Sequence, residues 1–224
     1  MSQYDPLGLL APLLVQAKLL LRNLYGKGRE MAWDVPLPRE QAVAWADLIK
    51  KAQHCPEISF PRSISPLSGV DPEIIAFWDG SLSAHGACLY MRWELGGGEG
   101  EARLITGKCR VAPLAGATVQ RMELQGLTLC ARLVVKVLEG LDMVVRGVTF
   151  VGDSLCCVMA LRVDGVHFNP YFQHRLCDIQ DNLDRIQEVV EVLHPVSWTE
   201  SANNPADLVT KAMATAEDMA PGGI

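Results

Sequence analysis

The chain of 224 residues contains no Cys-x-x-Cys pair, although it has seven cysteines. Structural zinc sites are usually built on such closely spaced pairs, so the sequence does not predict one. The cysteines fall mostly inside apolar runs, which indicates reduced residues of a protein core. We therefore expect an intracellular protein of the cytoplasm or nucleus.

A continuous apolar run of membrane-spanning length is also missing. The apolar stretch Leu7–Leu21 is broken by Pro12, Gln16 and Lys18, and it falls short of the roughly 20 residues that a span needs. A buried amphipathic helix is the better interpretation, and no membrane partner is expected. An apolar content of 49% with 21% charged residues is typical of a globular protein.

Positive charge is scarce, because the formal net charge is −6. Residues 1–66 carry eight Lys/Arg against six Asp/Glu, whereas residues 67–224 carry twelve against twenty. Bound divalent cations would cancel part of this negative charge. The acidity that remains argues against strong non-specific binding to nucleic-acid phosphates by this chain alone.

A segment rich in proline, serine and glycine, residues 61–72, divides the chain into two predicted parts. Residues 1–66 are expected to form a small helical segment, with helices near 7–25 and 38–52. Residues 67–224 are expected to form an α/β domain, a mixed five-stranded sheet flanked by helices. Its predicted strands are 73–79, 85–95, 102–111, 144–152 and 189–198, and its predicted helices are 118–139, 154–162, 170–187 and 204–214.

Four carboxylates stand where the local sequence should expose them. Asp79 and Asp153 end apolar, strand-like runs, Glu123 lies in the long amphipathic helix, and Asp207 opens the last predicted helix. Carboxylates from two strand ends and two helices can hold a pair of hard cations, which in turn can hold a phosphodiester for hydrolysis. This pattern predicts a metal-dependent nuclease.

Each carboxylate also has an ordinary structural interpretation. Asp79 precedes Gly80 in a good hairpin turn, Asp153 could cap a helix, and Asp207 stands in a first helical turn. Glu123 lies off the solvent-facing stripe of its helix, where a buried carboxylate costs several kcal/mol unless it is paired or metal-bound. It could instead reach water or the helix dipole. The joint pattern, rather than any single position, favours a site.

Four short motifs contain these carboxylates, and they resemble the catalytic motifs of the ribonuclease H family. The motifs are Phe77-Trp78-Asp79-Gly80-Ser81, Met122-Glu123-Leu124-Gln125, Gly152-Asp153-Ser154 and Asn204-Pro205-Ala206-Asp207. The segment Ile105–Leu138 resembles more narrowly the ribonuclease H domain of Pao-type (Bel/Pao) LTR retrotransposon polyproteins. Two stretches, Asp5–Pro12 and Trp33–Pro38, resemble the segment that joins reverse transcriptase to ribonuclease H in those elements. The resemblance covers about residues 4–214.

This resemblance implies a ribonuclease H-like domain at 67–224, preceded by a connection segment of reverse-transcriptase type at 1–66. It implies endonucleolytic hydrolysis of the RNA strand of RNA–DNA hybrids during retroelement reverse transcription. The reverse-transcriptase portion of the same polyprotein is the implied partner. Two Mg²⁺ ions, with Mn²⁺ as a substitute, would be held by the catalytic set, with one carboxylate bridging both ions. That set is Asp79, Glu123, Asp153 and Asp207, with Asp79 as the bridge.

Four further residues are candidates for contact with the nucleic acid. A hybrid is distinguished from duplex DNA through 2′-hydroxyl groups. The backbone at Gly80 and Ser81 and the side chain of Gln120 are placed to reach such a group, and Ser154 is placed to reach a phosphate.

The chain departs from the family at two places. Gly152 stands where the family usually has threonine, and Trp198-Thr199-Glu200-Ser201 stands where it commonly has His-Val-Pro-Gly. No histidine lies between Trp198 and Asp207, so product release is expected to be slow. The polymerase palm is absent, which excludes polymerisation by this chain alone.

Other functions of related enzymes fit less well. Proofreading-type exonucleases carry an Asp and a Glu two residues apart on the first strand, but position 81 is Ser81. Integrase-type enzymes end their set with Glu, whereas this set ends with Asp207. The remaining alternative is a catalytically idle retroelement-derived module that binds nucleic acid or has a structural role. Its expected signature is a lost carboxylate, and none is lost, but the acidity of the chain keeps it open.

Overall fold

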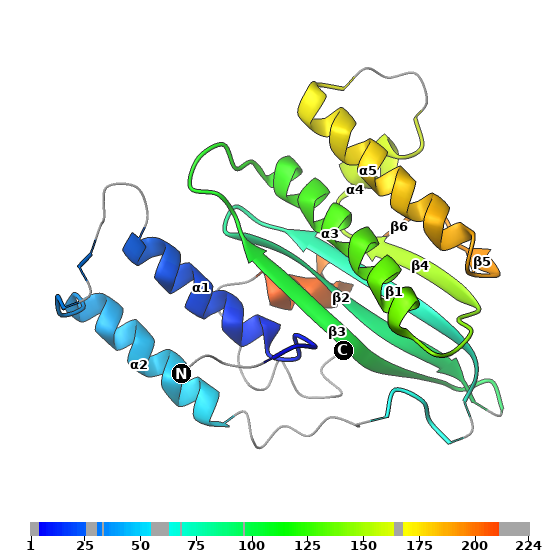
Figure 1. The fold of residues 1–224 in the computed structure, drawn as a ribbon, viewed down its shortest axis with the longest axis horizontal. Helices are drawn as coiled ribbons and strands as arrows, with labels where there is room; N and C mark the ends of the chain where they lie inside the picture. Colours follow the sequence, from blue (N-terminus) through cyan, green and yellow to red (C-terminus); the bar gives the residue numbers. More distant parts are fainter. Residues whose placement is uncertain are drawn as a thin grey trace.

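A computed structural model of the protein describes residues 5–25, 31–32, 34–54, 63–67, 69–95, 97–163 and 168–210. Two helices come first, and a sheet flanked by helices follows (Figure 1). The elements are α1 (Ala11–Tyr25), α2 (Arg39–His54), β1 (Val70–Gly80), β2 (Ala84–Glu94), β3 (Gly100–Val111), α3 (Val119–Gly140), β4 (Gly147–Gly152), α4 (Leu155–Ala160), α5 (Pro170–Gln187), β5 (Val192–Leu193), β6 (Ser197–Trp198) and the 3-10 helices η2 (Ser201–Asn203) and η3 (Pro205–Val209). None of the helices within these residues is long and apolar enough to cross a membrane.

The sheet is mixed, and its strand order is β3-β2-β1-β4-β5, with β6 also pairing with β4. The first three strands form an antiparallel meander, and β4 runs parallel to β1, β5 and β6. A meander of three strands followed by a parallel strand is the mixed α/β sheet that the sequence predicts. The parallel pairing of β1 with β4 brings their carboxyl ends to the same edge of the sheet.

Three predicted elements differ most from the structure. The single strand expected at 189–198 is two short strands on either side of Pro195. Their pairing with β4 differs by one residue, since Val148 pairs with Leu193 but Val151 pairs with Ser197. The helix expected at 204–214 is the 3-10 helix η3, and residues 211–214 lie outside the described part of the chain. The helix expected at 7–25 begins only at Ala11, because Gly8 has a positive φ of 68°.

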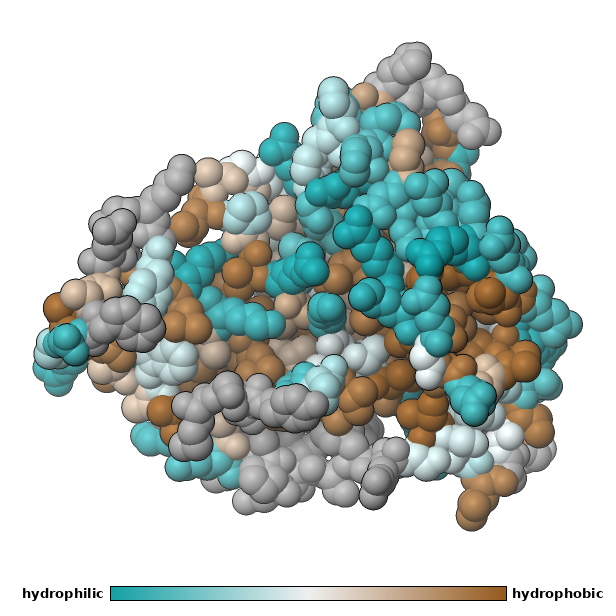
Figure 2. Space-filling model, in the orientation of Figure 1, coloured by the Kyte–Doolittle hydropathy of each residue, from teal (hydrophilic) through white to brown (hydrophobic). Residues whose placement is uncertain are grey.

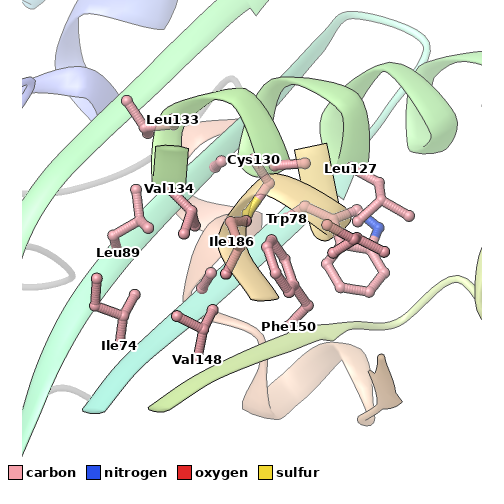
Figure 3. Packing of buried hydrophobic residues seen from close by; sticks show 14 of the residues in the cluster. Ile74, Trp78, Leu89, Leu127, Cys130, Leu133, Val134, Val148, Phe150 and Ile186 are labelled. Atoms are coloured by element: carbon pink, nitrogen blue, oxygen red, sulfur yellow. The ribbon is translucent and has the colours of Figure 1, made fainter. Parts of the chain in front are cut away.

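The larger core lies between the sheet and helices α3 and α5. Figure 3 shows Leu127, Cys130 and Val134 of α3 pointing toward Trp78 and Phe150 of the sheet. Every third or fourth residue of α3 is apolar on this side, so the helix buries one continuous stripe. This packing holds α3 along β1, the strand that carries Asp79.

A smaller core lies on the opposite face of the sheet and joins the first helix to the rest of the domain. It contains Ala11, Val15 and Leu19 of α1, together with residues of β2, β3 and η3. In Figure 1, α1 lies beside β3, and α2 lies on the side of α1 away from the sheet. The two predicted N-terminal helices thus pack on each other, and α1 also packs on β3 and η3. The expected boundary at residues 66 and 67 stays a prediction.

The turn before α1 docks on β3 through its backbone. The carboxylate of Asp5 accepts hydrogen bonds from the N–H groups of Leu9 and Leu10 at 3.0 and 2.9 Å. The N–H of Gly107 in β3 donates to the carbonyl of Leu7 at 2.9 Å. Gly8 faces Gly107 so closely that a Cβ on Gly8 would stand 1.6 Å from the Gly107 oxygen. The Asp-Pro-Leu-Gly sequence therefore serves to cover an edge of the sheet.

We expect Leu19→Ala to destabilise the whole domain by about 2–4 kcal/mol, because Leu19 is only 8% exposed in the smaller core. The matched control is Leu21→Ala in the same helix, where the side chain is 45% exposed and the cost should stay below about 1 kcal/mol. Urea unfolding followed by tryptophan fluorescence measures both. Equal effects of the two substitutions would show that α1 is not part of the domain core.

Candidate active site

The carboxylates of Asp79, Glu123 and Asp153 come together at one edge of the sheet. One carboxylate oxygen of each residue lies within 4.8 Å of a carboxylate oxygen of the other two. Asp79 is the penultimate residue of β1, Asp153 directly follows β4, and Glu123 projects from α3. Asp79 and Glu123 are buried, and Asp153 is half-buried. Among the described residues, this is the one group of three such side chains that could hold a metal ion.

Two glycines allow α3 to approach β1 closely enough for this cluster to form. A Cβ on Gly80 would lie 2.2 Å from the backbone nitrogen of Glu123, and one on Gly126 would lie 2.5 Å from the carbonyl oxygen of Asp79. The backbones therefore touch on both sides of Glu123. Any side chain at either glycine would separate the helix from the strand and Glu123 from Asp79.

The chain after β6 holds the carboxylate of Asp153 in place. Ser201 donates a hydrogen bond from its Oγ to Asp153 Oδ2, and Asn204 Nδ2 donates to Oδ1 at 3.3 Å. The indole N–H of Trp198 donates to the backbone oxygen of Asp153 at 3.0 Å. The departure from His-Val-Pro-Gly in this stretch thus supplies side chains that position Asp153.

Asp79 is held from the same part of the chain. The Oγ1 of Thr210 donates to Asp79 Oδ2. Asn204 Nδ2 also donates to the carbonyl of Trp78 at 2.9 Å, so one amide connects the end of β1 with Asp153. The sequence analysis missed Ser201, Asn204 and Thr210 as parts of the site. Two of these residues could have been found from the sequence. Asn204 lies within the Asn-Pro-Ala-Asp motif, and Thr210 lies one turn beyond Asp207.

Asp207 lies beside the cluster rather than inside it. It belongs to η3 and is half-buried, and it is not among the three carboxylates that meet within 4.8 Å. Its negative charge nevertheless contributes to raising the pKa of Asp79. The structure therefore places the fourth predicted carboxylate at the edge of the site.

The electrostatics of the cluster are unfavourable without a cation. Burial, and then the charges of Asp79 and Asp153, raise the pKa of Glu123 to about 9. Burial also raises the pKa of Asp79 to about 6, with further increases from Asp153 and Asp207 and an opposing hydrogen bond from Thr210. Glu123 Oε2 is buried and has no hydrogen-bond partner among the described residues.

A divalent cation fits this donor set. Oxygen ligands from carboxylates are what Mg²⁺ takes in proteins. A buried carboxylate oxygen that lacks a hydrogen-bond donor is costly, and a cation between the three side chains would satisfy it.

The predicted nucleic-acid contacts lie around this edge. Gly80 is buried against α3, and Ser81 closes the turn after β1, where its Oγ accepts from the N–H groups of Ser83 and Ala84. Gln120 is exposed in the first turn of α3, and Ser154 is half-buried just after Asp153. Only Gln120 thus presents an exposed side chain, while the others offer backbone or partly covered groups.

The replacement of threonine by Gly152 has a structural reason. Gly152 pairs with Trp78 across the parallel strands β4 and β1. A Cβ on Gly152 would lie 2.3 Å from the indole of Trp78, which is fully buried. The indole therefore fills the space that a threonine side chain would take, and the path of β4 into Asp153 is preserved.

The sequence matches the family model described as the Pao retrotransposon-like RNaseH-like domain over residues 1–154. The chain belongs to this family. The matched residues include α1, α2 and the three clustered carboxylates, and they end before Asp207. Among curated proteins, none matches this chain.

Several solved structures are similar to this chain at low sequence identity. RNase H1 from the halophilic archaeon Halobacterium salinarum is 15% identical, with 59% of this chain and 89% of that chain covered and a TM-score of 0.40. LC11-RNase H1 in complex with an RNA/DNA hybrid is 13% identical, with coverage of 59% and 88% and a TM-score of 0.38. The prototype foamy virus protease-reverse transcriptase is 13% identical, with coverage of 85% and 24% and a TM-score of 0.33.

The close contact between α3 and β1 predicts opposite results for two glycines of the same helix. Gly126→Ala should cost about 1–3 kcal/mol of stability, because the added Cβ meets the Asp79 backbone. It should also weaken stabilisation by Mg²⁺, because Glu123 moves away from Asp79. Gly140→Ala meets nothing within 4 Å, so it should be neutral or stabilising by up to about 1 kcal/mol. Urea unfolding with and without Mg²⁺ measures both effects, and equal behaviour of the two variants would contradict the close-contact argument.

We expect the metal-free protein to lose stability as the pH rises from about 5 to about 9. The pKa values of Asp79 and Glu123 are raised in the folded state from 3.8 and 4.5 to about 6 and about 9. The folded state therefore keeps protons that the unfolded chain has released, so unfolding becomes easier with rising pH until both groups are ionised in both states.

Thermal melts in a chelator between pH 5 and 9 measure this loss, and Mg²⁺ should reduce it. Glu123→Gln should flatten the pH dependence, whereas Glu139→Gln, an exposed position of the same helix, should leave it as in the wild type. A pH dependence that survives Glu123→Gln unchanged would show that Glu123 is not its source.

Proposed function

We propose that this protein is a metal-dependent ribonuclease H that cuts the RNA strand of RNA–DNA hybrids. The observation that carries the proposal is the cluster of Asp79, Glu123 and Asp153 at the carboxyl edge of β1 and β4, with one buried oxygen of Glu123 left without a partner. Membership of the Pao retrotransposon-like RNaseH-like domain family supports the same reaction. The place of action is retroelement reverse transcription, in the cytoplasm or nucleus.

In the proposed site, one group of residues would bind metal, and a second group orients the metal-binding carboxylates. Asp79, Glu123 and Asp153 would hold Mg²⁺ or Mn²⁺, and Asp207, at the edge of the cluster, would complete the site for a second ion. When bound, two such ions activate water and stabilise the leaving oxygen of a phosphodiester. Thr210 holds Asp79 by its hydroxyl group, and Ser201 and Asn204 hold Asp153. The carboxylates are thus oriented before the substrate arrives, which limits the reorganisation needed during reaction.

Residues around the carboxylate cluster would recognise the substrate. Gly80, Ser81 and Gln120 lie next to Asp79 and Glu123 along the chain, and we assign them to the 2′-hydroxyl groups that distinguish RNA from DNA. Ser154 follows Asp153 directly and is assigned to a phosphate. Residues 1–66 act as the connection to the reverse-transcriptase portion of the same polyprotein, which is the proposed protein partner.

A second candidate function keeps the fold without the reaction: an idle module that binds nucleic acid or has a structural role. The observation that favours it is the net charge of −6, which weakens attraction to a polyanionic substrate. The two candidates differ in one result, since the idle module can bind Mg²⁺ and still leave the hybrid intact.

The decisive measurement is cleavage of a labelled RNA strand annealed to DNA, with the protein in excess so that slow product release does not hide the chemical step. Wild type should cut the hybrid in Mg²⁺ or Mn²⁺ and leave a DNA duplex of the same sequence intact. Glu123→Gln and Asp153→Asn should each reduce the rate at least about 100-fold, because a lost ligand removes several kcal/mol of metal stabilisation.

Glu139→Gln serves as the matched control, since Glu139 is exposed on the same helix and pairs with Arg185. It should cut at the wild-type rate. Wild type that binds Mg²⁺ but leaves the hybrid whole would establish the idle module instead. Cleavage that persists in Glu123→Gln would remove Glu123 from the site.

A further inference from the structure

A groove of about 250 Å³ runs between α3 and the strands β2 and β3. Its polar lining comes from all three elements, and no acidic residue contributes to it. Apart from Thr128, its polar and charged side chains are His85, Lys108, Arg110, Gln125, Arg132 and Lys136. Figure 2 shows hydrophilic residues gathered over α3 and α5 on the face turned to the viewer. In a chain of net charge −6, this is a local concentration of positive charge.

Most of these cations have no counter-ion. Arg132 pairs with Asp178 of α5. Lys108, Arg110 and Lys136 are exposed, and none of them makes a side-chain hydrogen bond or ion pair with another described residue. Lys108 and Arg110 are two residues apart on β3, so both point to the side of the sheet that α3 covers. The groove therefore presents unneutralised positive charge to solvent.

One buried side chain in the groove also lacks a partner. His85 is only 7% exposed, it lines the groove, and its Nδ1 has no hydrogen-bond partner among the described residues. It stands directly opposite Arg110 in the pairing of β2 with β3. Burial, together with the charge of Arg110, lowers the pKa of His85 to about 4. Its ring is thus neutral near pH 7, and the unpaired nitrogen calls for a ligand group or water.

The groove lies beside the candidate active site, and the two share neighbouring residues on β1, β2 and α3. His85 is the cross-strand neighbour of Gly80, one residue beyond Asp79. Gln125 lies two residues beyond Glu123 on α3. From Gln125 to Lys136 the helix advances about 16 Å at 1.5 Å per residue. At about 3.4 Å per nucleotide, the groove matches about five nucleotides of one strand.

We propose that this groove binds the phosphates of one nucleic-acid strand where that strand leaves the catalytic carboxylates. The inference rests on the proposed nuclease function, because it extends the substrate contacts of that site. Arginine and lysine on β3 and α3 fit a chain of phosphates, which carries a charge at every repeat. An acidic peptide would also be attracted to these cations, but it would have no reason to start at the metal-binding edge.

The test is the salt dependence of hybrid binding by the full chain. Binding is measured by fluorescence anisotropy in Mg²⁺ with the Asp153→Asn variant, so that the substrate is not cut. Adding Lys108→Gln and Arg110→Gln should weaken binding about tenfold or more at low salt. It should also reduce the slope of log K against log salt by about 2, because two phosphate contacts are lost. Both side chains are exposed, so the thermal melt should not change.

The matched control is Arg39→Gln with Lys50→Gln on α2, which removes the same charge away from the groove. It should leave both the Kd and the slope unchanged. A second, local measurement is the NMR signal of the His85 imidazole, which should shift on addition of the hybrid only while Lys108 and Arg110 are present.

The outcomes separate the groove from the nuclease. Hybrid cleavage by wild type, with the same Kd and slope in the Lys108→Gln, Arg110→Gln protein, overturns the groove and leaves the nuclease. No cleavage, with binding that still depends on Lys108 and Arg110, overturns the nuclease and supports a nucleic-acid groove. Loss of binding to a polyglutamate peptide, but not to the hybrid, overturns the proposal in favour of an acidic protein partner.

Discussion

The contact between α3 and the end of β1 is the constraint on which the site depends. At this contact two backbones meet without side chains between them, at Gly80 and Gly126. The contact fixes the distance between Glu123 and Asp79, while the parallel pairing of β1 with β4 fixes Asp153 beside them. Both conditions are set by backbone geometry rather than by the carboxylates, whose mutual repulsion would drive them apart.

The stability that opposes this repulsion comes from both faces of the sheet. On one face, α3 and α5 bury the larger core around Trp78 and Phe150. On the other, α1 and η3 bury a smaller core against β2 and β3. Burial on this scale can balance a site in which Glu123 has its pKa raised to about 9. The cost of burying these carboxylates close together is therefore tolerated in the fold, and a cation that relieves it would also stabilise the folded state.

Much of the fold could be predicted from the sequence, because its longer elements have clear periodicity. The helix α3 and strands β1 to β3 lie close to their predicted ranges. The error at 189–198 arose because Pro195 interrupts a run whose flanks both look like strand. The position of α1 on the sheet depends on a contact between Gly8 and Gly107, which are about a hundred residues apart. Sequence periodicity reports only local structure, so it does not predict this contact.

The carboxylates of the site could be named from their motifs, but the groups that orient them could not. Asp79, Glu123 and Asp153 each end or interrupt an apolar pattern, which is a local signal. Ser201 carries no such signal, and Thr210 has only its place one turn beyond Asp207. A hydroxyl group is common in loops, and its partner is decided by the tertiary fold. Asn204 is an intermediate case, since it sits in a recognised motif while its bonds to Trp78 and Asp153 depend on packing.

The net charge of the chain is a poor guide to its function, because acidic and basic side chains are concentrated in different parts of the molecule. The carboxylates that are expected to hold metal are buried or half-buried at the edge of β1 and β4, where cations would neutralise them. The unpaired cations Lys108, Arg110 and Lys136 line a groove together with His85, which pairs with Gly80 next to that edge. A polyanion meets the local field of the surface it touches rather than the total charge of the chain. A chain of net charge −6 can thus present a positive surface to nucleic acid next to an acidic site.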